Sequence, residues 1–185
     1  NREKLRERVG DFAVMSQVHG DTVFVIDQIP AQVPVADALI TANSEIALVV
    51  MVADCIPLLL RSEKLVAAVH VGRAGLMNSI AVKTVAMMSA LGATQIMGSI
   101  GPAICGKCYE VPQELHDEVI ARHPLARSTT RTGTPALDLP KALIAALAEV
   151  DVPVGISAGC TLEDQNSFSY RRNQITGRQA GVIKL

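Results

Sequence analysis

Short apolar runs, separated by turns and charged residues, dominate the first part of the chain. Runs that are rich in β-branched residues predict strands at 12–18, 22–26, 47–52, 57–60 and 65–69. The runs at 47–52 and 65–69 contain only apolar residues, which indicates buried strands. Because the early strands follow one another without intervening helices, the pattern disfavours a doubly wound parallel sheet.

Helical patterning and capping signals predict four helices, at 2–9, 76–91, 113–122 and 139–150. Gly92 is the expected end of the second helix, and Asp138 is the expected N-cap of the fourth. A further strand is expected at 95–100, and the polar segment 124–135 is expected to form a mobile surface loop. The chain is thus predicted to be a single α+β domain, residues 1–185, with a central mixed β-sandwich flanked by helices.

The composition of the chain indicates a single domain and argues against nucleic-acid and membrane partners. The 185 residues are 49% apolar, which is ample for the core of one domain. A net charge of −1 and the absence of tryptophan give no surface for nucleic acid. The longest apolar runs have about eight residues, far short of the roughly 20 that a membrane helix needs. No secretory signal is visible, so we expect a cytoplasmic protein without nucleic-acid or membrane partners.

Three segments each place one soft ligand beside small residues: QVHG at 17–20, ADCIP at 53–57 and AVHVG at 68–72. Their donors, His19, Cys55 and His70, are those of a catalytic zinc site with a fourth position left open. Imidazole and thiolate suit zinc or copper and exclude magnesium or calcium. His19 is expected at a strand end, and Asp54 is expected to orient a ligand histidine.

Cys105 and Cys108 form a C-x-x-C motif whose role stays open. A thioredoxin-like motif should begin a helix, but residues 109–112 read as extended. A structural zinc site would require a second pair of cysteines, and Cys55 and Cys160 stand alone in the sequence. We interpret the motif as a loop that follows the strand at 95–100.

Two further polar groups are candidates for substrate binding. Gly72 and Gly75 flank Arg73 directly before a helix, where backbone amides and a guanidinium could bind an anion. The alternative is an ordinary loop with a solvated arginine. The second group, residues 169–172, contains Ser169 and Arg171 in a segment that otherwise reads as strand, and its alternative is a solvated face.

An ordered set of motifs covers essentially the whole chain and resembles a known family. The pieces are QVHG at 17–20, ADA at 36–38, ADCIPLLL at 53–60, AAVHVGRAGL at 67–76, GPAICGKCYEV at 101–111 and the segment 160–185. They are similar to the YfiH-like family of zinc-containing purine nucleoside phosphorylases, which has also been called polyphenol oxidase, laccase-domain protein or peptidoglycan editing factor. The resemblance implies a layered α/β/β/α arrangement.

The resemblance also implies a function and a set of site residues. The implied reaction is phosphorolysis of purine nucleosides, such as adenosine, inosine, guanosine or methylthioadenosine, with adenosine deamination as a related activity. The implied metal ligands are His19, Cys55 and His70, and Arg73, Ser169 and Arg171 would meet the substrate or phosphate. Many relatives have an aromatic residue followed by arginine where this chain has Arg73-Ala74. Relatives also carry a segment ahead of Asn1, without which we expect an incomplete substrate pocket.

Two other classes of enzyme remain as alternatives. A metal-free Cys–His amide hydrolase or deamidase, acting on a peptidoglycan precursor, would use Cys55 and His70 as nucleophile and base and would not need His19. A copper-dependent phenol oxidase ranks third, because the methionines do not fall beside the three ligands in the sequence and only four histidines are present.

Overall fold

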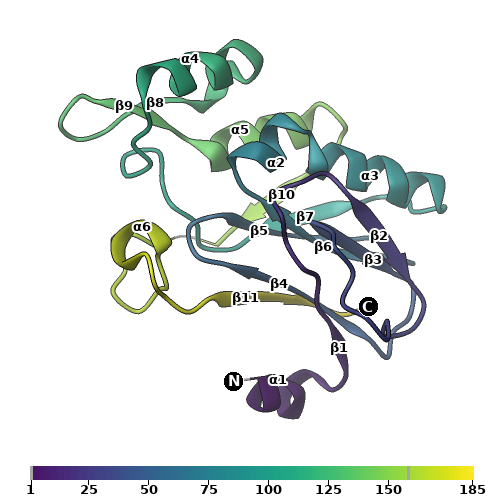
Figure 1. Ribbon diagram of the computed structural model, residues 1–185. Coiled ribbons are helices and arrows are strands. Elements are labelled where there is room, and N and C mark those ends of the chain that lie inside the picture. The colour runs from purple at the N-terminus through teal and green to yellow at the C-terminus, as the bar shows by residue number, and fades with distance from the viewer. Residues whose placement is uncertain (1, 158) are drawn as a thin grey trace.

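The computed structural model describes residues 2–157 and 159–185 and shows a layered arrangement of helices and strands (Figure 1). The strands are β1 (Phe12–Ala13), β2 (Val23–Ile26), β3 (Ala38–Thr41), β4 (Ala47–Val52), β5 (Ile56–Arg61), β6 (Val66–Val71), β7 (Met97–Ile100), β8 (Arg127–Thr129), β9 (Pro135–Leu137), β10 (Val154–Ile156) and β11 (Gln179–Ile183). The helices are α1 (Arg2–Val9), α2 (Arg73–Met77), α3 (Ile80–Ala90), α4 (Gln113–Arg122), α5 (Leu139–Ala148), α6 (Tyr170–Asn173) and the 3-10 turn η1 (Pro124–Ala126).

The larger sheet has six strands in the order β10-β7-β5-β6-β3-β2 and is mixed. The pairs β3–β6, β5–β6 and β5–β7 are antiparallel, whereas β2 pairs with β3 and β10 with β7 in parallel. Along β6, side chains alternate between two cores, with Ala67 and Val69 facing the helices and Val66 and Ala68 facing the second sheet. Both faces are covered, so every residue of β6 is buried.

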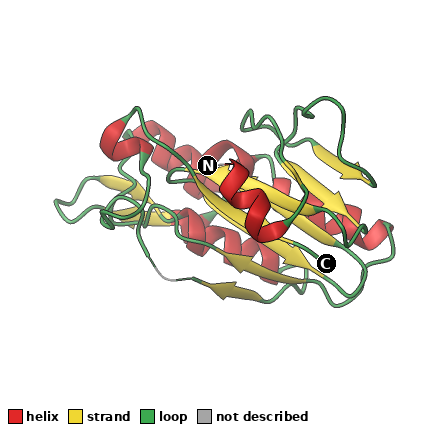
Figure 2. Cartoon of the chain, turned by 90° about the horizontal axis from the view of Figure 1, so that it is seen from below, coloured by secondary structure: helices red, strands yellow, loops and turns green. Residues whose placement is uncertain are grey.

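The smaller sheet, β1-β4-β11, packs on the six-stranded sheet and completes a sandwich. Leu48 and Val50 of β4 point into the space between the sheets, while Ala47 and Val49 point outward. Leu5 and Val9 of α1 pack on that outer face, and Figure 2 shows this helix lying over the strands. Helices α2, α3 and α5 cover the opposite face of the six-stranded sheet (Figure 1). The predicted α+β sandwich flanked by helices is confirmed.

Several boundaries differ from the prediction for identifiable reasons. The strand expected over 12–18 ends at Ala13, and His19 consequently lies in a loop rather than at a strand end. The helix expected over 76–91 is broken at Ser79, whose φ of 60° is left-handed. The segment 124–135 contains η1 and β8 and reaches β9, so it is not a structureless loop. Among the described residues, no helix has the length and apolar character that crossing a membrane requires.

Candidate metal centre

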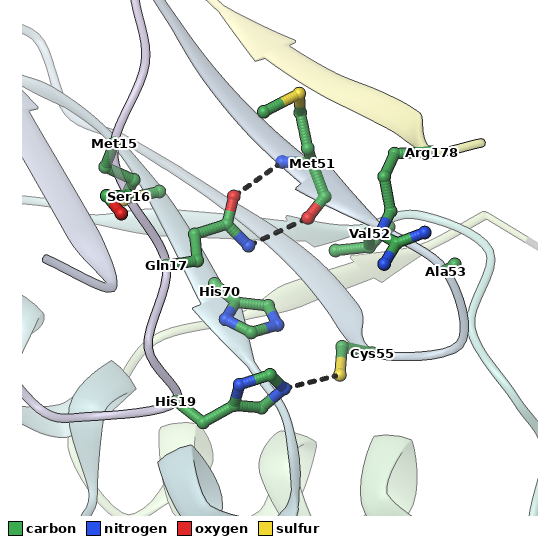
Figure 3. Close-up of a pocket in the computed structure, with 10 residues that line it drawn as sticks. All are labelled: Met15, Ser16, Gln17, His19, Met51, Val52, Ala53, Cys55, His70 and Arg178. Carbon is green, nitrogen blue, oxygen red and sulfur yellow. Dashed lines mark hydrogen bonds between the residues drawn. The ribbon is translucent and has the colours of Figure 1, made fainter. Parts of the chain in front are cut away.

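His19, Cys55 and His70 converge at one end of the sandwich (Figure 3). One donor atom from each residue lies within 4.8 Å of the others, and the Cys55 Sγ atom is 3.8 Å from His19 Nε2. Strand β6 carries His70, and Cys55 directly precedes β5, the antiparallel partner of β6. His19 adopts a φ of 59°, and its ring meets that of His70 edge to face. The structure therefore brings together the three ligands that the sequence predicted.

One fully buried carboxylate, that of Asp37, holds both histidines in place. Its Oδ1 atom is 2.7 Å from His70 Nδ1 and accepts the backbone N–H of His19 at 3.0 Å. Its Oδ2 atom accepts the N–H groups of Val18 at 3.2 Å and Gly20 at 2.7 Å. Burial raises the pKa of Asp37, but the hydrogen bonds from His70 and the loop amides outweigh burial and lower it.

The Asp37 contact determines which ring nitrogen of His70 carries the proton. Burial lowers the pKa of His70, and the hydrogen bond to Asp37 opposes that change only in part. A neutral imidazole that donates from Nδ1 to a carboxylate leaves Nε2 without a proton. Carboxylate–histidine pairs of this kind orient imidazole ligands of metals. His70 is thus prepared to bind an ion through Nε2.

Asp54 does not orient a ligand histidine, so this prediction was wrong. Its two carboxylate oxygens accept hydrogen bonds at 2.7 Å from the Thr161 hydroxyl and from the Arg171 backbone N–H. Asp54 also has a φ of 88°, and its carbonyl accepts the N–H of Ile104 at 3.0 Å. Asp54 therefore fixes the loop of Cys55 to distant segments. The ADA motif at 36–38 contained the residue that orients His70, but nothing in the sequence indicated its partner.

The space in front of the three donors is kept open by Gly72. A Cβ atom at this position would lie 3.0 Å from Cys55 Sγ and 3.1 Å from His19 Cδ2. Two nitrogen donors, one sulfur donor and an open side match the ligand set of a catalytic transition-metal site. The residues could therefore hold a metal ion.

We expect Gly72→Ala to weaken metal binding by about tenfold or more, near 1.4 kcal/mol. The backbone at Gly72 has φ −91° and ψ −174°, which alanine adopts readily, so the effect comes from crowding of the donors. Metal affinity can be measured by competition with a chromophoric chelator. Gly155→Ala is the matched control, since a Cβ there would meet nothing closer than 3.9 Å. Equal affinities in both variants would contradict this description of the site.

Burial raises the pKa of Cys55 to about 11, and the charge of Asp54 adds to this rise. Arg178 opposes it, which places a positive charge near the thiol. A thiol with such a pKa stays protonated at neutral pH unless a cation stabilises its thiolate form. The environment alone therefore does not produce a free thiolate.

A cavity of about 330 Å³ opens beside the three donors (Figure 3). Its far wall is formed by residues 15–17 and 51–53, where the Gln17 side-chain amide pairs with the backbone N–H and C=O of Met51 at 2.9 and 2.8 Å. Arg178 also lines the cavity and, like Asp37, was not predicted as a site residue, although it lies within the matched segment 160–185. The cavity thus combines the three donors with one guanidinium.

Arg73 and Arg171 lie near the phenol of Tyr109. Burial raises the pKa of Tyr109, and both arginines oppose this rise. The guanidinium of Arg171 lies 5.1 Å from the Tyr109 ring centroid and donates to the carbonyl of Glu110 at 3.0 Å. Arg73 is half-buried at the start of α2, next to Gly72. Two positive charges therefore lie close to the segment that carries Cys55.

Ser169 occupies a structural position that the sequence did not predict. It is fully buried, and its hydroxyl accepts the N–H of Arg172 at 3.1 Å as the N-cap of α6. The segment forms a helical turn where a strand was expected. The geometry does not support the predicted contact of Ser169 with a substrate.

Comparison with known proteins gives consistent results. A purine nucleoside phosphorylase of Corynebacterium glutamicum is 41% identical, over 100% of this chain and 80% of its own length. One from Streptomyces griseus is 42% identical with the same coverage. Among solved structures, a Neisseria meningitidis protein has a TM-score of 0.89 at 31% identity and is covered over 79% of its length. The YfiH protein of Bacillus licheniformis has a TM-score of 0.88 at 26% identity and the same coverage.

A family model described as multi-copper polyphenol oxidoreductase laccase matches residues 1–185. The relatives named above share most of their length with this chain, and their names are those of enzymes. The sequence motifs and the layered fold lead to the same assignment. The chain belongs to this laccase-like family, which includes the YfiH proteins.

Proposed function

We propose that this protein is a zinc-dependent purine nucleoside phosphorylase whose ion is bound by His19, Cys55 and His70. The observation that carries the proposal is the convergence of these donors around the space that Gly72 keeps open, beside a cavity with a guanidinium. The proposed reaction, phosphorolysis of purine nucleosides, is the one for which the relatives are named. Phosphate would displace the purine from C1′ of the nucleoside, so that the glycosidic bond breaks and the free base and ribose 1-phosphate are formed.

The donor set favours zinc over copper. A blue-copper site would add a weak axial ligand, usually methionine, to two histidines and a cysteine. Met15 and Met51, which do not adjoin the three ligands in the sequence, both line the cavity, but the Met51 thioether points away from the three donors (Figure 3). When bound, zinc supplies Lewis acidity to an oxygen atom at its open position.

The protein groups supply position and charge. Asp37 fixes the two histidines relative to each other, and Asp54 fixes the loop of Cys55. Arg73, Arg171 and Arg178 surround this region with positive charge, which would attract phosphate and stabilise the negative charge that develops on the departing purine as the glycosidic bond breaks. Adenosine deamination would use the same site but would not require phosphate.

We expect Arg73→Ala to slow phosphorolysis about ten- to hundredfold, because it removes a charge-assisted contact worth about 1.5–3 kcal/mol. Deamination of adenosine should change much less, since only phosphorolysis uses bound phosphate. Both rates can be measured by chromatography of nucleoside, base and inosine. Arg8→Ala, an exposed position on α1, is the matched control. Equal losses in both reactions would mean that Arg73 supports the loop or the sugar instead.

The Cys–His hydrolase remains the second candidate because His19 Nε2 lies 3.8 Å from Cys55 Sγ. The partner of the thiol would then be His19, not His70 as the sequence suggested. The raised pKa of Cys55 disfavours this reading, since a nucleophilic thiolate is usually associated with a lowered pKa.

The two candidates are separated by removing the metal. We expect a chelator to abolish nucleoside turnover and added zinc to restore it. His19→Ala should lower the zinc content by about one ion per chain. Release of ammonia from an amide substrate by chelated protein, with no turnover of any nucleoside, would exclude the phosphorylase and support the hydrolase.

A further inference from the structure

A second group of cysteines lies apart from the three donors described above. Cys105, Cys108 and Cys160 come together with Glu163, and one donor atom from each lies within 4.8 Å of the others. The sequence shows no second pair of cysteines, but the structure places Cys160 and Glu163 beside Cys105 and Cys108. The chain segments are far apart in sequence, and the second pair is a cysteine and a glutamate three residues later rather than two cysteines.

The two pairs sit on turns of the same construction. In the first turn, the carbonyl of Cys105 accepts the N–H groups of Cys108 and Tyr109, both at 3.0 Å. In the second, the carbonyl of Cys160 accepts those of Glu163 at 3.1 Å and Asp164 at 2.9 Å. Each turn consequently presents its first and fourth side chains on one side, which is how C-x-x-C loops present their ligands to zinc.

Backbone contacts hold the two turns side by side. Ala103 and Cys160 form a parallel bridge, in which the N–H of Thr161 donates to the Ala103 carbonyl at 3.2 Å. The N–H of Cys105 points at Cys160 Sγ from 3.4 Å, so that a backbone donor already faces this sulfur. The guanidinium of Arg172 fastens the second turn by donating to the carbonyls of Thr161, Leu162, Asp164 and Ser167.

The charges around the cluster suit a bound cation. Cys108 Sγ lies 3.3 Å from a carboxylate oxygen of Glu163, and all three thiols are free of disulfides. The guanidinium of Arg131 pairs with Glu163 and donates to Cys108 Sγ at 3.5 Å. Three thiolates and a carboxylate together carry more negative charge than a divalent ion neutralises. The positive charge of Arg131 would offset part of the remaining negative charge.

We propose that Cys105, Cys108, Cys160 and Glu163 form a structural zinc site. Four protein ligands close the tetrahedron and leave no position for a substrate, in contrast to the three-donor centre. The sulfur-rich set selects zinc over magnesium or calcium. The ion would join the loop that follows β7 to the segment that precedes α6.

This second site would also support the first. The hydroxyl of Thr161, next to Cys160, donates to Asp54, and the N–H of Ile104, next to Cys105, donates to the Asp54 carbonyl. Asp54 directly precedes Cys55 in the chain. Zinc between the two turns would therefore fix both anchors of the loop that carries Cys55.

A crossed set of variants tests the proposal by zinc analysis of protein purified without added metal. The wild type should contain about two ions per chain, and His19→Ala and Cys108→Ser should each contain about one. The double variant should contain none. Cys108→Ser protein with the wild-type content, or His19→Ala protein with no zinc, would overturn the second site.

X-ray absorption at the zinc edge of His19→Ala protein gives an independent test in which all four proposed ligands are intact. We expect about three sulfur neighbours near 2.3 Å and one oxygen near 2.0–2.2 Å. This measurement decides the question even if Cys108→Ser fails to fold. A spectrum dominated by nitrogen neighbours would overturn the proposal. So would metal-free protein whose mass, measured by mass spectrometry of the intact chain, is lower by the two hydrogens lost when a disulfide forms.

Discussion

Cys55→Ser should lower the rate of phosphorolysis at least about a thousandfold, near 4 kcal/mol, while the protein stays folded. Serine has nearly the same size as cysteine, but its hydroxyl does not replace a thiolate as a soft zinc ligand. The rate can be measured as formation of hypoxanthine from inosine and phosphate.

The control for this prediction is chelated wild-type protein, to which zinc should restore activity. Zinc should not restore the Cys55→Ser variant at the concentration that restores the wild type. Circular dichroism checks that both proteins are folded. Retention of a tenth of the wild-type rate in the variant would show that Cys55 does not hold the metal.

Asp37→Asn should raise the dissociation constant for zinc at the three-donor site by about 10- to 100-fold. The amide keeps the shape of the carboxylate but removes the charge that orients His70 and accepts three loop N–H groups. One of its two terminal atoms is a donor, so at least one of these contacts is lost. Asp37→Ala should in addition destabilise the fold by about 1–3 kcal/mol, because the buried Nδ1–H group of His70 loses its acceptor.

The matched control is Asp21→Asn, which removes an exposed carboxylate paired with Lys83. Exposed ion pairs contribute about 0–1 kcal/mol, so this variant should bind zinc and unfold as the wild type does. Zinc affinity can be measured by chelator competition and stability by urea denaturation. Equal zinc affinities for the two asparagine variants would show that Asp37 does not control the site.

The parts of the fold that could be predicted are those set by local pattern. The apolar run 47–52 corresponds residue for residue to β4, and the helix 113–122 to α4. Asp138 caps α5 by accepting the N–H of Lys141, as its place before Pro140 indicated. Each of these features depends on neighbours within a few residues, which the sequence displays directly.

The parts that could not be predicted depend on contacts between distant segments. Strand β1 is short because only Phe12 and Ala13 pair with β4, and no local signal marks where that pairing stops. Asp37 meets His70 across 33 positions of sequence, whereas Asp54, the carboxylate adjacent to a ligand, turns toward Thr161. The convergence of Cys160 with Cys105 spans 55 positions, so spacing rules for paired cysteines did not detect it.

Zinc-dependent phosphorolysis is tested most directly by the phosphate dependence of inosine cleavage by zinc-loaded protein. Hypoxanthine and ribose 1-phosphate should form in equal amounts, only when phosphate is present, and His19→Ala protein should form neither. Cleavage that proceeds equally without phosphate, or undiminished cleavage by His19→Ala protein, would contradict a zinc-dependent phosphorylase.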